Sequence, residues 1–135
     1  MNSNLNFRVE NKFDYYPTIA KWYEEHDFPV ISFDITPEHL FVASNDTKDL
    51  YCIPIHVTAS TLAYIAFPVS NKGATKEEKK GAFTQLLTYA EETLGLLGYT
   101  TFVTTSDTPV LMKMFAEAGY EESEKNVTYY IKNLK

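Results

Sequence analysis

Positive charge gathers at one place in this chain, at the start of a long helical pattern. Four lysines fall within nine residues there, and Gly81 follows them directly. Clustered positive charge is what neutralises phosphate groups, so the segment is a candidate anion site. Glu77 and Glu78 lie among the lysines, and a solvated helix start with mixed charges is therefore the alternative interpretation. The cluster consists of Lys72, Lys76, Lys79 and Lys80.

His56 is the best candidate for a general base. It lies in a strand-like run, and an unperturbed histidine titrates near pH 6.5, within reach of physiological pH. A half-buried strand histidine without chemistry is the alternative. The other two histidines, His26 and His39, fall in expected loops and have no partner at metal-ligand spacing, so no metal site is predicted.

Length and composition predict one domain over residues 1–135, large enough to bury about two thirds of its unfolded surface. The 44% apolar and 15% aromatic residues are typical of a globular protein, and the apolar runs are too short to span a bilayer. Cys52 is the only cysteine, so no intrachain disulfide is possible. The first six residues do not read as a secretory signal. We therefore expect a cytoplasmic protein without a membrane partner.

The charge balance argues against nucleic-acid binding. The net charge is -6, and Arg8 is the single arginine beside eleven lysines. Nucleic-acid binding needs an extended basic surface, which this composition does not offer.

The hydrophobic pattern predicts alternating strands and helices in the order β, α, β, β, β, α, β, α, β. The expected first helix is capped by Asp14 or Tyr16 and has Pro17 in its first turn. Pro54 lies within an expected strand and predicts a bulge or an edge position. The expected strands cover residues 7–9, 40–43, 51–57, 62–67, 100–104 and 126–131.

Two helices are expected in the second half of the chain. Thr75 and Glu78 have the spacing of a capping box and predict a helix start at Thr75. Its apolar stripe ends at Leu97, and Gly98 or its neighbour closes it. Thr108 followed by Pro109 predicts the start of the other helix, which ends at Gly119.

Residues 75–120 resemble the GCN5-related N-acetyltransferase (GNAT) superfamily. The resemblance rests on Gly81, Leu86-Leu87 and Gly98 in the first helix, and on Phe115 four residues before Gly119-Tyr120 in the second. It implies an α/β (α+β) fold in which a mixed central sheet is flanked by helices on both faces. It also implies acetyl-CoA as cofactor and acetyl transfer to an amine.

The resemblance implies a cofactor site at the long helix and at the strand before it. Phe67 and Val69 would contact the pantetheine arm, together with the turn Val69-Ser70-Asn71. The phosphates would lie at the helix start, because a helix N-terminus offers unpaired amides and glycine permits close approach. The residues implied there are Lys79, Lys80, Gly81 and Ala82.

Several positions depart from the superfamily pattern. Glu78 and Phe83 replace residues of the phosphate turn, and a helix that starts at Thr75 would bury the amides of that turn, leaving those of residues 71–77 as contacts. Phe115 stands where the superfamily has a tyrosine that protonates the departing thiolate. Ala66 stands where related proteins have an acidic base. His56 is then the remaining candidate base.

A closer resemblance is to small GNAT-like proteins of tailed bacteriophages and bacteria. It runs from Lys21-Trp22-Tyr23 through Phe28-Pro29 and Leu40-Phe41-Val42 to Val69-Ser70-Asn71 and Ala74-Thr75-Lys76-Glu77. It implies a location in the host cytoplasm or the virion if the chain is phage-encoded.

Three hypotheses follow. The first is an acetyltransferase acting on a small amine or peptide, with its acceptor pocket between residues 15–23 and the final strand near Tyr129. The second is a catalytically inactive protein that binds a protein partner, forms a homo-oligomer or assembles into a phage particle. The third is a sensor that binds CoA without turnover.

Overall fold

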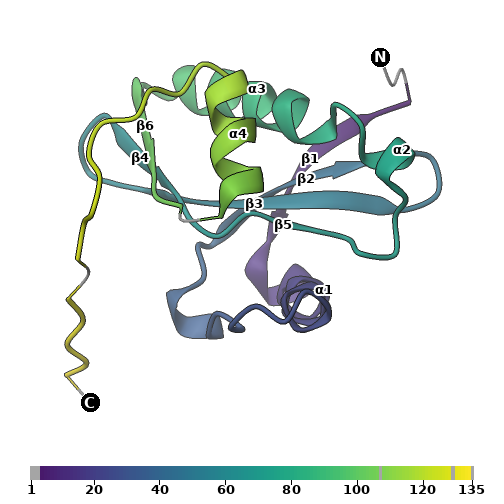
Figure 1. The fold of residues 1–135 in the computed structure, drawn as a ribbon, viewed down its shortest axis with the longest axis horizontal. Helices are drawn as coiled ribbons and strands as arrows, with labels where there is room; N and C mark the ends of the chain where they lie inside the picture. Colours follow the sequence, from purple (N-terminus) through teal and green to yellow (C-terminus); the bar gives the residue numbers. More distant parts are fainter. Residues whose placement is uncertain (1–3, 107, 129, 135) are drawn as a thin grey trace.

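A computed structural model describes residues 4–106, 108–128 and 130–134 (Figure 1). The element order confirms most of the sequence prediction, apart from its C-terminal strand. The elements are β1 (Asn6–Asn11), α1 (Lys12–Glu25), the 3-10 turn η1 (Phe33–Ile35), β2 (His39–Ser44), β3 (Asp49–Val57), β4 (Leu62–Ile65), β5 (Val69–Ser70), α2 (Lys76–Lys79), α3 (Ala82–Gly95), β6 (Thr101–Thr104) and α4 (Pro109–Glu117).

The strands form one mixed sheet in the order β1-β2-β3-β4-β6, and β5 pairs with β3 beyond the end of β4. The pairs from β1 to β4 are antiparallel, whereas β4 and β6 are parallel. The parallel pair is possible because α2 and α3 carry the chain back between the two strands. The expected mixed α/β sheet is confirmed.

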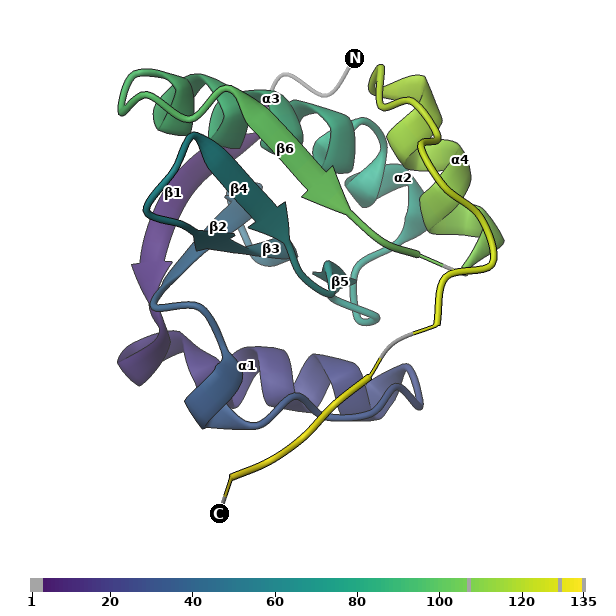
Figure 2. The same ribbon diagram turned by 90° about the vertical axis from the view of Figure 1, so that its left-hand side faces the viewer.

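Helices cover both faces of the sheet. α1 lies on one face, where Ile19 and Trp22 pack against Leu40 and Val42 of β2. α3 and α4 lie on the other face, where Leu86 and the ring of Phe115 belong to a larger apolar core (Figures 1 and 2). No helix within the described parts of the chain is long and apolar enough to cross a membrane.

α1 begins earlier than the sequence predicts. Its N-cap is Asn11, the last residue of β1, whose side-chain oxygen accepts a hydrogen bond from the amide of Asp14 at 3.0 Å. The predicted caps at Asp14 and Tyr16 are therefore wrong, and Pro17 lies inside the helix rather than in its first turn. The sequence pattern was ambiguous because asparagine and aspartate both make good caps.

The C-terminal prediction is also wrong. None of the described residues after α4 forms a strand, so the expected strand over residues 126–131 is absent from 126–128 and 130–131, and Tyr129 lies outside the described residues. Instead the chain leaves the domain beyond Tyr120, and every described residue from Glu121 on is exposed (Figure 1). Leu97 is 71% exposed rather than part of the core, because α3 ends at Gly95.

A polar network joins β1, α1 and β3 at the end of the sheet. Arg8 donates to both carboxylate oxygens of Asp49 at 3.0 and 2.9 Å, and the hydroxyl of Tyr15 donates to Asp49 at 2.8 Å. Burial by itself would raise the pKa of Asp49, but the hydrogen bonds from Arg8 and Tyr15 outweigh it and hold that pKa below its ordinary value.

We predict that this network makes the free energy of unfolding fall at low pH. A carboxylate with a depressed pKa contributes stability above the unfolded pKa of about 4, and loses it as the pH falls through the folded value. The free energy of unfolding of the wild type should therefore decline more steeply below about pH 4 than that of Asp49→Asn. Urea denaturation between pH 7 and pH 3 measures both, and Asp46→Asn controls for loss of one exposed carboxylate. Equal slopes for wild type and Asp49→Asn would contradict the prediction.

Candidate functional site

The strand that pairs with β3 is interrupted in its middle. Ile65 of β4 pairs with Ile55, and Val69 of β5 pairs with Cys52. Three residues therefore lie between these pairs on one strand and two on β3, which is the arrangement of a β-bulge. The bulge at Ala66–Pro68 confirms the prediction of a bulge near Pro54 and ends β4 two residues earlier than expected.

Pro54 explains why the strand is interrupted there. Its carbonyl accepts a hydrogen bond from the amide of Ala66 at 2.9 Å, but a proline has no N–H to return to the opposite strand. Phe67 follows with a φ of 54°, in the left-handed region that is an outlier for a bulky residue. Its carbonyl turns to α1, where the hydroxyl of Tyr23 donates to it at 2.6 Å.

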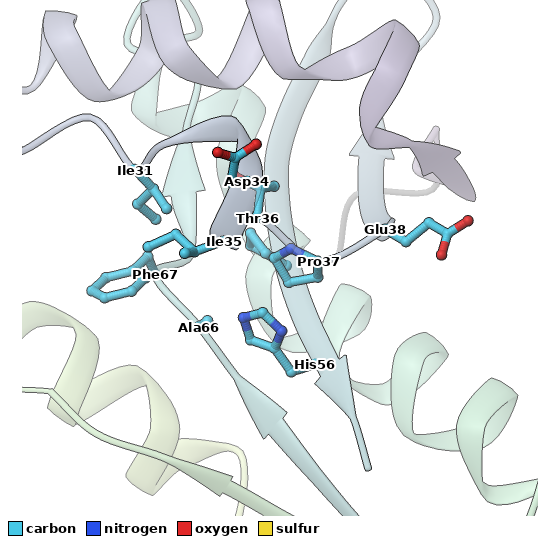
Figure 3. A pocket seen from close by; sticks show the side chains of 10 residues that line it. Ile31, Asp34, Ile35, Thr36, Pro37, Glu38, His56, Ala66 and Phe67 are labelled. Atoms are coloured by element: carbon cyan, nitrogen blue, oxygen red, sulfur yellow. The ribbon is translucent and has the colours of Figure 1, made fainter. Parts of the chain in front are cut away.

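The bulge opens a pocket of about 470 Å³ on the α1 face of the sheet (Figure 3). One wall is the bulge with β3, and the other is the loop around η1. Lys12 holds that loop, because its ammonium group donates to the carbonyls of Phe33 and Thr36 at 2.8 and 3.1 Å. The lining residues are Ile31, Asp34, Ile35, Thr36, Pro37, Glu38, Pro54, His56, Ala66 and Phe67.

His56, the predicted base, is one of these lining residues. Its ring lies between Ala66 and the loop in Figure 3. Partial burial and the positive charge of Lys12 lower the pKa of His56 below its ordinary value of 6.5. The imidazole is therefore neutral at pH 7 and able to accept a proton. In Figure 3 the carboxylate of Glu38 points away from this ring.

The start of the long helix differs from the sequence prediction. The capping box is confirmed, since Thr75 accepts from the amide of Glu78 and Glu78 accepts from the amide of Thr75. The helix that it caps is the single turn α2, which ends at Lys79. Gly81 has a φ of 76° and breaks the chain direction, so that α3 begins separately at Ala82. The prediction that the helix runs on from Thr75 is wrong.

This break leaves the α3 N-terminus with amides that the helix itself does not satisfy. Gly81 is the N-cap and supplies no side-chain hydrogen bond. The first amides of a helix have no partner within it and carry a partial positive charge, which favours an anion. Lys80 is exposed beside this end, and Lys79 is half-buried with its ammonium group 3.4 Å from the hydroxyl of Ser70.

The side chains at the implied pantetheine site are largely used by the fold. Val69 and Ala82 are buried on opposite faces of the sheet. Asn71 donates to the carbonyl of Asp49 and accepts from the amide of Gly73, both at 2.8 Å. Phe67 is different, because 60% of its side chain is exposed at the mouth of the pocket. The backbone of Asn71 is used as well, because its amide donates to the carbonyl of Leu50 at 2.8 Å and its carbonyl accepts from the amide of Ala74 at 3.0 Å.

Two features of this edge were not found from the sequence. Pro68 has no amide to offer a ligand, and His26 at the end of α1 contacts the carbonyl of Ser70 at 3.0 Å through Nε2. A hydrogen bond to a carbonyl requires Nε2 to carry the proton, so this nitrogen is no base for the Ser70 hydroxyl 3.1 Å away. The missing amide proton of Pro68 follows from its residue type, whereas a loop histidine gives no sequence signal for a contact 44 positions away.

The positions that depart from the superfamily pattern have structural roles. Phe83 and Phe115 are buried and meet edge to face, with ring centroids 5.4 Å apart. The carboxylate of Glu78 also contacts the ammonium group of Lys48 at 3.2 Å, as part of an ion pair. Phe115 has no proton to donate, and its ring lies within the α3 core. No three acidic, histidine or cysteine side chains of the described residues form a group suited to a metal ion.

Solved structures share this architecture over nearly the whole chain. An aminoglycoside acetyltransferase from an uncultured soil metagenomic sample, in complex with trehalose, has a TM-score of 0.70 at 16% identity, covering 99% of both chains. The fold is that of these N-acetyltransferases. An aminoglycoside N-acetyltransferase in complex with CoA has a TM-score of 0.68 at 13% identity and covers 98% of both chains.

A third solved structure with the GNAT fold is that of an enzyme named for a protein acceptor. The ribosomal-protein-alanine N-acetyltransferase from Escherichia coli has a TM-score of 0.70 at 15% identity, covering 89% of this chain and 79% of that one. The sequence itself matches no protein-family model and none of the curated proteins. At these identities the likeness establishes the GNAT fold and leaves the activity to be argued from the site.

The residues present fit an acyl-CoA at the phosphate end. A Cβ on Gly81 would come within 3.2 Å of the Gln85 amide nitrogen, and the left-handed backbone there favours glycine. The turn therefore brings the side chain of Gln85 close to Gly81 at the α3 N-terminus. At the pantetheine end fewer backbone groups can bind a ligand. Pro68 has no amide to donate, and His26 already contacts the carbonyl of Ser70.

We predict that Tyr23→Phe destabilises the protein by about 1–3 kcal/mol, because it removes the hydrogen bond that satisfies the carbonyl of Phe67. Tyr64→Phe is the matched control. Its hydroxyl pairs with Thr105 in an exposed position, so its loss should cost less than about 0.5 kcal/mol. Denaturant unfolding of both variants measures the difference, and equal effects would show that the bulge does not depend on Tyr23.

Gly81→Ala should destabilise the protein by about 1 kcal/mol, because alanine is strained at a positive φ. Gly95→Ala should instead change stability by less than about 0.5 kcal/mol, since Gly95 is the last residue of α3 and a Cβ there meets open space. Denaturant unfolding tests the pair. A neutral or stabilising Gly81→Ala would mean that the left-handed break before α3 does not form.

Proposed function

We propose that this protein transfers an acetyl group from acetyl-CoA to an amine, with His56 as the base that takes the proton from the amine. The observation that carries the proposal is the pocket at the bulge, where His56 and Phe67 line a space of about 470 Å³. Pockets of this size accommodate small molecules. The lowered pKa of His56 supplies a neutral imidazole at physiological pH.

Acetyl-CoA supplies the activated acetyl group when it is bound. Lys79, Lys80 and the amides after Gly81 would hold its phosphates, and the ring of Phe67 with the backbone amide of Ser70 would hold its pantetheine arm. Support comes from the break between α2 and α3, which separates these amides from the preceding turn. A neighbour of the same fold was solved in complex with CoA.

The acceptor is a small amine or a peptide N-terminus. Neighbours of the same fold are named for aminoglycosides and for a ribosomal-protein alanine, which are both amine-bearing acceptors. Holding an amine beside the acyl donor lowers the activation barrier by several kcal/mol through orientation alone. A thiol has an ordinary pKa of about 8.5, so the departing thiolate is stable enough to leave without the proton that Phe115 lacks.

The second candidate function is that of a catalytically inactive protein with the GNAT fold. Pro68, the occupied carbonyl of Ser70 and the buried ring of Phe115 favour it, because each removes a group that a ligand or leaving thiolate would use. Such a protein would bind a partner, as in assembly of a phage particle, or sense CoA without turnover. In a phage it would lie in the host cytoplasm or the virion.

We predict that wild-type protein releases CoA from acetyl-CoA when it is screened against polyamines, aminoglycosides and peptide N-termini. His56→Gln should lower kcat/KM by about 10²-fold to 10⁴-fold, because it removes the base. His39→Gln, at an exposed histidine at the start of β2, should leave kcat/KM unchanged. The wild-type kcat/KM should rise with pH and level off, with its inflection below pH 6.5.

Thermal unfolding with acetyl-CoA separates the candidates. Acetyl-CoA at one hundred times its Kd should stabilise the folded protein by about 2.7 kcal/mol. A thermal shift without turnover on any acceptor would favour the sensor. The absence of both shift and turnover would overturn the enzyme proposal in favour of partner binding, and equal activity of His56→Gln and wild type would exclude His56 as the base.

A further inference from the structure

The C-terminal end of α1 contacts the segment after the bulge through two long side chains. Nε2 of His26 lies 3.0 Å from the carbonyl of Ser70 and 3.1 Å from its hydroxyl. The ammonium group of Lys72 donates to the carbonyl of Glu25 at 3.0 Å. These partners are 44 and 47 positions apart in the sequence. The end of α1 is therefore fixed beside β5 by tertiary contacts, and only the histidine contact uses the backbone of β5.

The backbone of Ser70 points away from β3. Its neighbour Asn71 donates to the carbonyl of Leu50, which lies opposite it. Successive residues of an antiparallel pair alternate between facing the partner strand and facing away. The amide and the carbonyl of Ser70 therefore both face the other side of β5, where no strand of the described residues pairs with it.

An extended amide ligand pairs with such an edge through both groups. Each amide unit of a pantetheine arm has one N–H and one carbonyl, so it can accept from the Ser70 amide and donate to the Ser70 carbonyl, as an added strand does. That carbonyl already accepts from His26. Because Nε2 also contacts the Ser70 hydroxyl, the imidazole covers the outer side of this residue. The ligand and the imidazole therefore compete for one acceptor.

His26 can leave Ser70 by rotation of its side chain alone. The backbone around it is fixed, since Asp27 has a φ of 59° and the amide of Phe28 donates to the carbonyl of Tyr23 at 2.9 Å, which closes the helix end. The imidazole stacks on the ring of Phe28, with centroids 5.2 Å apart, and that ring is 41% exposed. Movement of the imidazole at this surface needs no repacking of the core.

We propose that His26 is a displaceable latch on the cofactor site. In the free protein it occupies the carbonyl of Ser70, and it turns away when the pantetheine arm binds there. The inference rests on the proposed binding of acetyl-CoA and adds a closed and an open state to that site. Binding is weakened by the latch, because the contact of His26 must break before the ligand gains its own. The occupied carbonyl is then a closed state of the site and not a loss of it.

His26→Ala tests the latch in the full-length protein. It should lower the Kd of pantetheine about 3-fold to 10-fold, the factor expected for one hydrogen bond that no longer competes. CoA should bind more tightly by the same factor. ADP carries phosphates and no pantetheine, so it should bind the wild type and His26→Ala alike. NMR titration to millimolar ligand, following the backbone amides, measures all three.

Lys72→Ala is the matched control. It removes the other contact between the end of α1 and this segment but leaves the carbonyl of Ser70 occupied, so the Kd of pantetheine should not change. Equal tightening by Lys72→Ala and His26→Ala would show that α1 is merely loosened, and would overturn the latch. An unchanged Kd in His26→Ala, beside turnover of acetyl-CoA by the wild type, would overturn the latch alone. Absence of CoA binding to both proteins would overturn the proposed function as well.

The imidazole signals of the wild type test the movement without a substitution. In the free protein Nε2 of His26 should carry its proton, because it donates to a carbonyl. Saturating pantetheine should shift the ring signals of His26 and make this proton exchange faster with water, since its hydrogen bond is lost. The ring of His39, exposed at the start of β2, should be unaffected. Unchanged His26 signals at saturation would contradict displacement and overturn the proposal.

Discussion

The missing amide proton of Pro54 is the constraint from which the candidate site develops. A strand that pairs regularly with β3 would need a donor at this point, and none is available. The opposite strand instead takes an extra residue, turns Phe67 into the left-handed region and resumes pairing at Val69. The pocket, the exposed ring of Phe67 and the short strand β5 all result from this single interruption.

Contacts from the helices on both faces of the sheet stabilise the interrupted strand. A left-handed conformation costs a bulky residue about 1–2 kcal/mol, and the Tyr23 hydroxyl offsets this cost by satisfying the carbonyl of Phe67. Tyr23 is itself fixed because it is buried in the α1 core. On the other side of the sheet, the packing of α3 carries its N-terminus to the level of β5, where Lys79 approaches Ser70. The site is therefore positioned by packing on both faces.

The elements with strong local signals were predictable from the sequence. The capping box at Thr75, the bulge near Pro54 and the central strands follow from side-chain types and spacing, and the spacing of Gly81, Leu86-Leu87 and Gly98 led to the GNAT fold. The break at Gly81 was missed because a single glycine inside a helical pattern is often tolerated. The contact of His26 with Ser70 spans 44 positions, which no local pattern encodes. The strand expected over residues 126–131 was predicted wrongly because these residues favour strands, whereas a strand also requires a neighbouring strand to pair with.

Chemical shifts of the backbone amides, recorded by NMR with and without CoA, test the central claim most directly. The account predicts that the largest shifts fall on residues 67 and 69–71 at the bulge and on residues 81–84 at the start of α3, while β1 at the far edge is unaffected. Shifts confined to other surfaces, or no shifts at millimolar CoA, would contradict the claim that the bulge and the α3 N-terminus form one cofactor site.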